Sequence, residues 1–263
     1  MKNKKSFLGL IIALLLILSA TGCTKTADQQ AAPVTLTVSA AASLKDAMEE
    51  IQTNYAQEKS TITINYSFGG SGALQQQIEN GADVDVFVSA ATKQMDALAD
   101  KGLLLDETRK NFLANQLVLV TPKGSDPISS INGLADEKIK RIALGEPKSV
   151  PAGQYAEETL TKLNLLDSLK NKIVYAKDVK EVLTWVETGN ADAGFVYATD
   201  AKASEKAEVA VVAPEDSHKP ILYPAAVIKA SKNVDAAKDF INYLYSDKTK
   251  AVFEKYGFTF ITE

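Results

Sequence analysis

Five turns along the chain carry residues that can donate hydrogen bonds to a small anion. They are centred on Ser43, Ser71, Ala152, Val179 and Tyr197, and each lies at or near the point where an expected strand passes into an expected helix. The first backbone N–H groups of a helix have no partner within it, and the helix dipole places partial positive charge there. Together with two serine hydroxyls and one phenol, these turns predict an anion site.

The donor types also indicate which anion would fit. The five positions offer hydroxyl and backbone N–H donors, but none of them is a lysine or an arginine. Such a set suits a small, fully deprotonated oxyanion, because a protonated oxyanion also needs an acceptor for its proton. Asp178 is the only nearby carboxylate, and we interpret it as the cap of its helix. Ser43 has a similar alternative, since serine often caps its own helix.

An enzymatic alternative rests on Ser71. The segment Gly69-Gly70-Ser71-Gly72-Ala73 comes close to the nucleophile-elbow pattern of α/β-hydrolases, which would make the chain a serine hydrolase. That reaction needs a general base, and the sole histidine, His218, lies in a polar loop that contains two prolines. We interpret His218 as a solvated loop residue and expect no catalytic residues.

The sequence favours neither a cation site nor a bound nucleotide. Asp83, Asp85 and Asp96 lack the spacing of a calcium loop, and the chain has no set of cysteines and histidines for zinc. The glycine-rich turn lacks the Gly-Lys-Ser/Thr of a nucleotide-binding phosphate loop. We therefore expect no cofactor and no cation site.

Hydrophobic periodicity predicts alternating strands and helices. Expected strands cover residues 34–38, 62–68, 84–88, 139–144, 173–176, 193–197, 209–212 and 222–228, and expected helices cover residues 44–55, 73–78, 95–98, 151–163, 179–186, 237–244 and 251–256. This alternation is typical of an α/β fold with parallel sheets flanked by helices.

The alternation of strands and helices is interrupted at the run 117–123, and Pro122, Gly124 and Pro127 mark a loop there. We place a first crossing between two lobes near this loop and a return crossing at 222–228. The predicted first lobe comprises residues 34–117 and 222–263, and the second comprises residues 118–221. The expected fold is a two-lobed α/β clamshell. Each lobe is a mainly parallel sheet flanked by helices, and the ligand lies in the cleft.

The N-terminus predicts export and anchoring. Three lysines precede the apolar run Phe7–Leu18, which is too short to span a membrane, so residues 1–22 are interpreted as a signal peptide. The only cysteine, Cys23, ends a stretch that resembles a bacterial lipoprotein cleavage box, although Ala20 stands where leucine is usual. A plain signal peptidase site is the alternative. Residues 23–33 would be the lipidated cysteine and a flexible tether, which predicts an extracytoplasmic, membrane-anchored monomer.

The charge balance is acidic. The 29 basic and 33 acidic side chains give a formal charge of −4, and removal of residues 1–22 would leave 26 basic side chains and a charge of −7. Nothing here suggests a nucleic-acid partner. An acidic protein repels anions at long range, so a bound anion must be held by local donors.

As an ordered set, the motifs of this chain resemble those of the molybdate-binding proteins of bacterial ABC importers. The resemblance extends from about Val34 to the C-terminus. It rests on the following segments: Ala41–Leu44, Gly69–Gly72, Asp85–Ala90, Val150–Gly153, Asp178-Val179, Gly194–Tyr197, Pro214–Lys219 and Tyr256–Phe258.

This resemblance implies a fold like that of type II periplasmic binding proteins, with molybdate or tungstate in the cleft. Ser43 and Ser71 would bind the oxyanion through hydroxyl and backbone donors, Ala152 and Val179 through backbone N–H groups, and Tyr197 through its phenol. Hinge closure would then deliver the anion to an ABC permease in the membrane. Family members often carry serines where glycines flank Ser71 in this chain. A clamshell for sulfate or phosphate remains the alternative, and nothing in the sequence separates molybdate from tungstate.

Overall fold

The computed structural model describes residues 32–261, which fold around two β-sheets. The predicted signal peptide, Cys23 and nearly all of the predicted tether lie outside the described residues. In the part of the chain that is described, no helix is long and apolar enough to cross a membrane.

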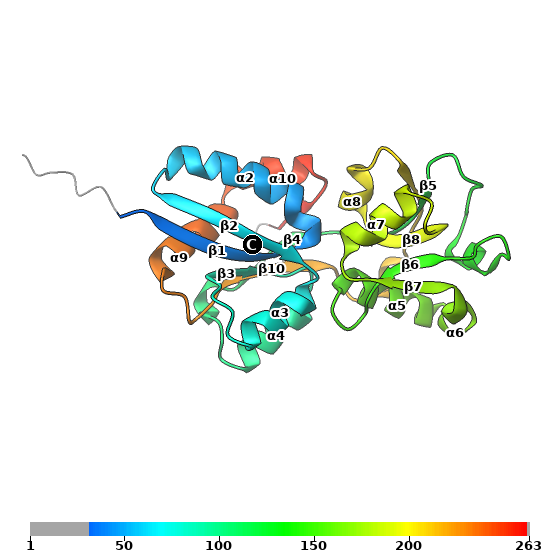
Figure 1. Cartoon of the computed structure of the whole chain (residues 1–263), viewed down its shortest axis with the longest axis horizontal. Coiled ribbons are helices and arrows are strands. Elements are labelled where there is room, and N and C mark those ends of the chain that lie inside the picture. Colours follow the sequence, from blue (N-terminus) through cyan, green and yellow to red (C-terminus); the bar gives the residue numbers. More distant parts are fainter. Residues whose placement is uncertain (1–31, 262–263) are drawn as a thin grey trace, which may run out of the picture. The chain divides into compact units, whose positions relative to one another are not determined.

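The first lobe is built on a six-stranded sheet with helices on both faces (Figure 1). The order of its strands is β11-β4-β10-β3-β1-β2. These strands are β1 (Val34–Ala41), β2 (Ile62–Gly69), β3 (Val86–Val88), β4 (Lys110–Ala114), β10 (Leu222–Val227) and β11 (Thr259–Phe260). The helices of this lobe are α2 (Lys45–Glu58), α3 (Ser71–Glu79), α4 (Thr92–Asp100), α9 (Val234–Leu244) and α10 (Asp247–Lys255), with 3-10 turns at Ala42–Leu44 and Asp106–Thr108.

The second lobe is built on a five-stranded sheet in the order β7-β6-β8-β5-β9. Its strands are β5 (Leu117–Pro122), β6 (Ile142–Gly145), β7 (Ile173–Ala176), β8 (Ala193–Tyr197) and β9 (Ala207–Val212). Its helices are α5 (Pro151–Lys162), α6 (Leu166–Leu169), α7 (Val179–Glu187) and α8 (Ala198–Lys202), with 3-10 turns at Ile131–Ala135, Lys170–Lys172 and Glu215–Ser217. The two-lobed α/β fold is therefore confirmed.

Both sheets are mixed, so the expectation of mainly parallel sheets is wrong. Strands β1, β2 and β3 pair in parallel, as do β6, β7 and β8. Strand β5 is antiparallel to β8 and β9, and β10 is antiparallel to β3 and β4. The reason is that β5 and β10 each enter a sheet directly from the other lobe, without the helical crossover that parallel neighbours need.

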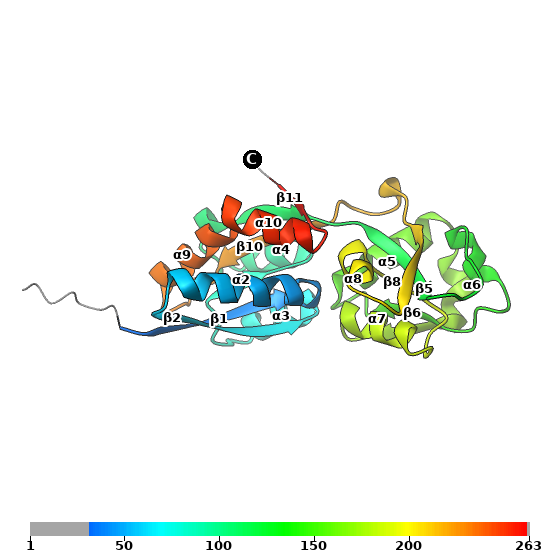
Figure 2. The same cartoon turned by 90° about the horizontal axis from the view of Figure 1, so that it is seen from above.

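Two segments pass between the sheets, one from Ala114 to Leu117 and one from Val212 to Leu222 (Figure 2). They run side by side, since the Asn115 N–H donates to the Ile221 carbonyl at 3.2 Å. The loop after Pro122, expected near the first crossing, follows β5 and therefore lies within the second lobe. The predicted lobe boundaries at 117/118 and 221/222 stay a prediction.

Local sequence explains where the site-bearing helices begin. Pro151 occupies the first turn of α5, where its missing N–H costs nothing. Asp178 caps α7 by accepting a hydrogen bond from the Glu181 N–H at 2.9 Å, as predicted. After the second crossing, α9 packs on β10 and β1 and α10 packs on α2. The last two helices thus complete the first lobe, as expected.

Candidate functional site

The five predicted site residues line a single cavity between the lobes. Its other lining residues are Ala41, Ala42, Gly69, Gly70, Ala90, Val150 and Pro151, and its volume is about 10 Å³. The lining comes from turns at the carboxyl ends of strands in both sheets, where ligands of open α/β sheets gather. A space of this size holds about one water-sized sphere, far less than the several hundred Å³ of a typical organic-ligand site.

The two serines are held by hydrogen bonds that do not cap their own helices. Ser43 lies in the 3-10 turn between β1 and α2, and its Oγ is 3.0 Å from the hydroxyl of Tyr223. Ser71 is the first residue of α3, and its Oγ accepts the Ala90 N–H at 3.0 Å. Neither helix start shows a side-chain cap. The alternative in which Ser43 only caps its helix is therefore wrong.

The backbone donors come from two helix N-termini of the second lobe. Ala152 is the second residue of α5, and Val179 is the first residue of α7. First-turn N–H groups have no acceptor inside their own helix. Asp178 does not line the cavity, and its carboxylate is engaged by Glu181.

Tyr197 contributes a buried hydroxyl group to the cavity. It is the last residue of β8 and only 1% exposed, and its Oη has no hydrogen-bond partner among the described residues. Burial raises the pKa of the Tyr197 phenol well above its ordinary value, so the phenol keeps its proton. A buried donor without a partner costs about 1–3 kcal/mol, which an anion in the cavity would recover.

The lobes meet through backbone atoms beside the cavity. The Gly72 N–H of the first lobe donates to the Ser149 carbonyl of the second at 2.8 Å. A Cβ atom at Gly72 would lie 2.7 Å from Ser149 Cα, and one at Gly70 would lie 2.8 Å from Ser149 O. The glycines that flank Ser71 therefore allow this close approach.

An ion-pair cluster joins the lobes next to the site. Lys180, the second residue of α7, has its Nζ 2.7 Å from Asp46 of α2 and 3.5 Å from Asp200 of α8. Asp200 is 1% exposed and accepts the Tyr197 N–H at 3.3 Å. Burial raises the pKa of Asp200 to about 6, and the nearby Lys180 offsets only part of this shift. Nothing in the sequence indicated this cluster.

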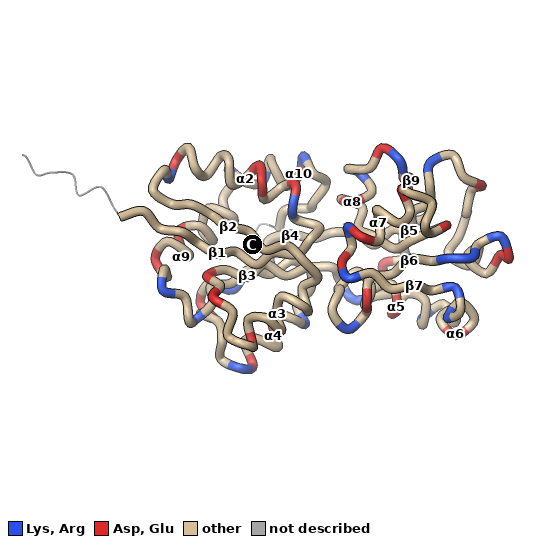
Figure 3. The backbone as a smooth tube through the Cα atoms, viewed as in Figure 1, with Lys and Arg blue, Asp and Glu red and all other residues tan. Residues whose placement is uncertain are grey.

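No lysine or arginine is among the described residues that line the cavity. Figure 3 shows that basic and acidic residues are spread over helices and loops of both lobes. A bound anion would be held by hydroxyls, N–H groups and helix termini alone.

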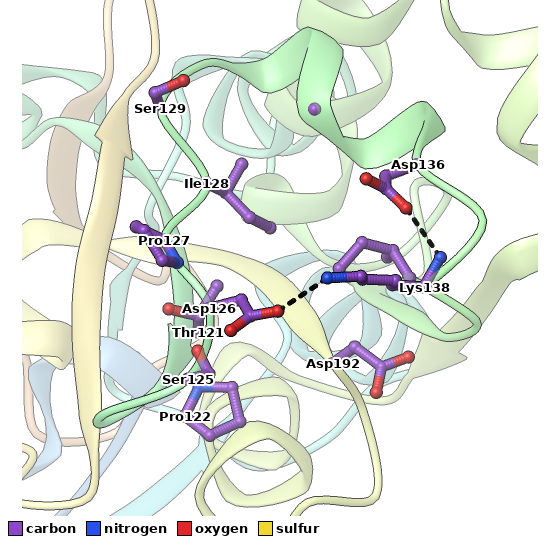
Figure 4. A pocket seen from close by; sticks show the side chains of 12 residues that line it. Thr121, Pro122, Ser125, Asp126, Pro127, Ile128, Ser129, Asp136, Lys138 and Asp192 are labelled. Carbon is purple, nitrogen blue, oxygen red and sulfur yellow. Dashed lines mark hydrogen bonds and ion pairs between the residues drawn. The ribbon is translucent and has the colours of Figure 1, made fainter.

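A larger cavity of about 530 Å³ lies in the second lobe (Figure 4). Three aspartates and Lys138 line it, and Lys138 already pairs with Asp126 at 3.0 Å. Both partners are more than three-quarters exposed. This excess of acidic groups does not suit an anion, and the described residues hold no group of three potential metal ligands.

The arrangement around Ser71 does not support a hydrolase. His218 lines a different hollow, where its Nδ1 lies 2.7 Å from the Lys219 carbonyl and its ring packs against Tyr155. The described partner of Ser71 Oγ is a backbone N–H, which cannot act as a general base.

Fold and cavity together define a two-lobed α/β binding protein with a small cavity between its lobes. The chain belongs to the family of bacterial extracellular solute-binding proteins, whose family model matches residues 36–259. Members of this family are extracytoplasmic binding proteins, so the expectation that the chain is not an enzyme is confirmed.

Individual relatives are similar over nearly the whole chain. A putative ABC transporter substrate-binding lipoprotein of Bacillus subtilis is 47% identical and covers 98% of both chains. The molybdate-binding protein of Haemophilus influenzae is 42% identical, over 87% of this chain and 91% of its own. The substrate-binding domain of a putative molybdenum ABC transporter from Clostridium difficile is 49% identical, with a TM-score of 0.67 over 87% of this chain and all of that one.

Proposed function

We propose that this chain captures molybdate or tungstate outside the cytoplasm and delivers it to the membrane permease of an ABC importer. The names of the relatives from Haemophilus influenzae and Clostridium difficile support this substrate. One observation of this chain carries the proposal: hydroxyl and N–H donors from both lobes converge on one small cavity. The Tyr197 hydroxyl, which has no partner among the described residues, is a donor prepared for an oxyanion.

In this proposal Ser43 and Ser71 bind the oxyanion from the first lobe, and Ala152, Val179 and Tyr197 bind it from the second. Because the donors are divided between lobes, their contacts are complete only when the cleft is shut. The anion therefore shifts the population toward the closed form, which the permease recognises. Attachment through a lipidated Cys23 and a monomeric state belong to the same proposal.

Thermal unfolding of the purified chain with molybdate, tungstate, sulfate or phosphate tests the substrate. A ligand that binds only the native state raises the melting temperature by mass action. We expect a rise with molybdate and tungstate and none with the other two anions. A rise with sulfate or phosphate alone would keep the binding site and overturn the substrate, and no rise with any of the four would contradict the proposed function.

A further inference from the structure

A chain of hydrogen bonds reaches Ser43 from the first crossing segment. It begins at Asn115, whose Oδ1 accepts the Gln116 N–H at 2.9 Å. That bond fixes which end of the Asn115 amide is the oxygen. The Nδ2 group, with two protons, therefore donates to Thr199 Oγ1 at 2.9 Å and to the Tyr223 hydroxyl at 3.2 Å.

Either hydroxyl could donate in the next link, between Tyr223 and Ser43, and we infer its direction from the other partner of Tyr223. Tyr223 is fully buried, and its hydroxyl already accepts a hydrogen bond from Asn115. Its own proton has Ser43 Oγ, 3.0 Å away, as its described partner. Burial raises the pKa of Tyr223 well above its ordinary value, so the phenol does not lose this proton. Ser43 Oγ thus accepts from Tyr223, which leaves the Ser43 proton free for the cavity.

Ser71 is arranged in the same way by a different group. The Ala90 N–H donates to Ser71 Oγ at 3.0 Å, which again leaves the serine proton free. The oxygen of each serine hydroxyl in the cavity therefore accepts a hydrogen bond from the protein, and its own O–H can donate one to a ligand. A donor that also accepts is polarised and becomes a better donor.

We propose that Asn115 and Tyr223 are positioning residues that orient the Ser43 hydroxyl proton toward the bound oxyanion. They thereby favour anions without protons over anions such as hydrogen phosphate, which must donate one. The proposal rests on the proposed function only in taking the occupant to be an oxyanion. Asn115 also contacts Thr199 of α8, so the same amide touches the second lobe.

A substitution that reverses the direction of the hydrogen bonds from Asn115 through Tyr223 to Ser43 tests the proposal. Asn115→Asp replaces the donor with an acceptor of nearly the same shape. The new carboxylate would draw the Tyr223 proton toward itself, Tyr223 would accept from Ser43, and a lone pair of Ser43 would face the anion. We expect the affinity for molybdate to fall by about tenfold or more, since roughly one charge-assisted hydrogen bond is lost. The preference for molybdate over hydrogen phosphate should fall with it.

The decisive variant is the double substitution Asn115→Asp with Tyr223→Phe. Phenylalanine cannot transmit the reversal, so the Ser43 proton is free again. Affinity should recover to within about threefold of Tyr223→Phe alone. A general structural defect, or a simple charge repulsion between the introduced carboxylate and the anion, would persist in the double variant. If the double variant binds no more tightly than Asn115→Asp, the relay is wrong.

Two controls separate this proposal from the proposed function. Tyr245→Phe removes a partly buried hydroxyl that donates to the carbonyls of Thr108 and Ala225. Tyr245 does not line the cavity, so this substitution should leave affinity unchanged. If the native protein binds sulfate instead of molybdate, the same variants are titrated with sulfate. The ligand-free protein gives an independent readout by NMR: nuclear Overhauser contact of the Tyr223 hydroxyl proton with the Ser43 methylene supports the relay, and contact with the Asn115 side chain alone overturns it.

Discussion

The Tyr197 hydroxyl affects the stability of the ligand-free protein and the affinity for the anion in different ways. Its hydroxyl is buried and has no partner among the described residues, so Tyr197→Phe should leave the ligand-free stability unchanged or raise it. The same substitution should weaken molybdate binding by about 1 to 3 kcal/mol, because a donor to a charged oxygen is lost. Calorimetric titration measures the affinity, and denaturant unfolding measures the stability.

Tyr66→Phe is the matched control for this residue. The Tyr66 hydroxyl donates to the Met48 carbonyl of α2, and Tyr66 does not line the cavity. Its loss should lower stability and leave affinity as it was. Unchanged molybdate affinity in Tyr197→Phe would remove Tyr197 from the site.

The cavity residues could be predicted because each belongs to a local pattern, a strand that ends in small residues and is followed by a helix. Asn115 and Tyr223 could not be predicted. They lie 108 positions apart, and Tyr223 in an apolar run indicates only a strand. What makes these two residues important is a contact between the first crossing segment and β10, which no local pattern contains.

At the level of elements, the start of α3 limits how closely the lobes approach. Gly72→Ala would place a Cβ atom 2.7 Å from Ser149 Cα, a distance that backbone cannot tolerate. The lobes would have to separate, so we expect weaker molybdate binding with little loss of ligand-free stability. Titration together with thermal unfolding of the same samples checks both parts of this prediction.

Gly69→Ala is the control on the same turn. Gly69 lines the cavity as well, but a Cβ atom there would face the Leu74 side chain, at 3.6 Å, which is ordinary van der Waals contact. It should bind molybdate like the native protein. If Gly72→Ala also binds normally, the lobes do not need this close approach to hold the anion.

Element types were predicted better than element directions. Most strands and all of the longer helices follow from hydrophobic periodicity, whereas β4, β5 and β11 were not predicted, and β5 was described only as an apolar run. The sequence of β4, KNFLA, shows no alternation, and β11 has two residues. The direction of β5 and β10 depends on which sheet each strand joins after a crossing, and periodicity within a strand carries no such information.

At the scale of the whole molecule, Asp200 makes folding depend on pH. Its pKa is about 6 in the folded protein and near 3.8 when unfolded, so between pH 4 and pH 6 the folded state binds more protons at this site. The contribution of Asp200 to the free energy of unfolding is therefore largest below pH 4 and falls as pH rises through 6.

Asp200→Asn removes this contribution and keeps most of the shape. The free energy of unfolding of the variant, minus that of the native protein, should rise between pH 4 and pH 7 by on the order of 3 kcal/mol. Carboxylates with lowered pKa values, such as Glu50 and Asp239, act in the opposite direction in both proteins and cancel in the difference. Urea unfolding at several pH values measures this difference, and a flat profile would show that Asp200 ionises normally.

The lack of lysine and arginine among the described cavity residues also affects the kinetics of capture. Hydrogen bonds inside a closed cavity are screened little by salt, so the rate of ligand escape should hardly depend on ionic strength. The association rate behaves differently, because a chain with a formal charge of −4 repels a doubly charged anion at long range. Added salt shortens the range of that repulsion to about 10 Å or less. The association rate should therefore be higher at high ionic strength than at low ionic strength. An anion site lined by lysines would show the reverse.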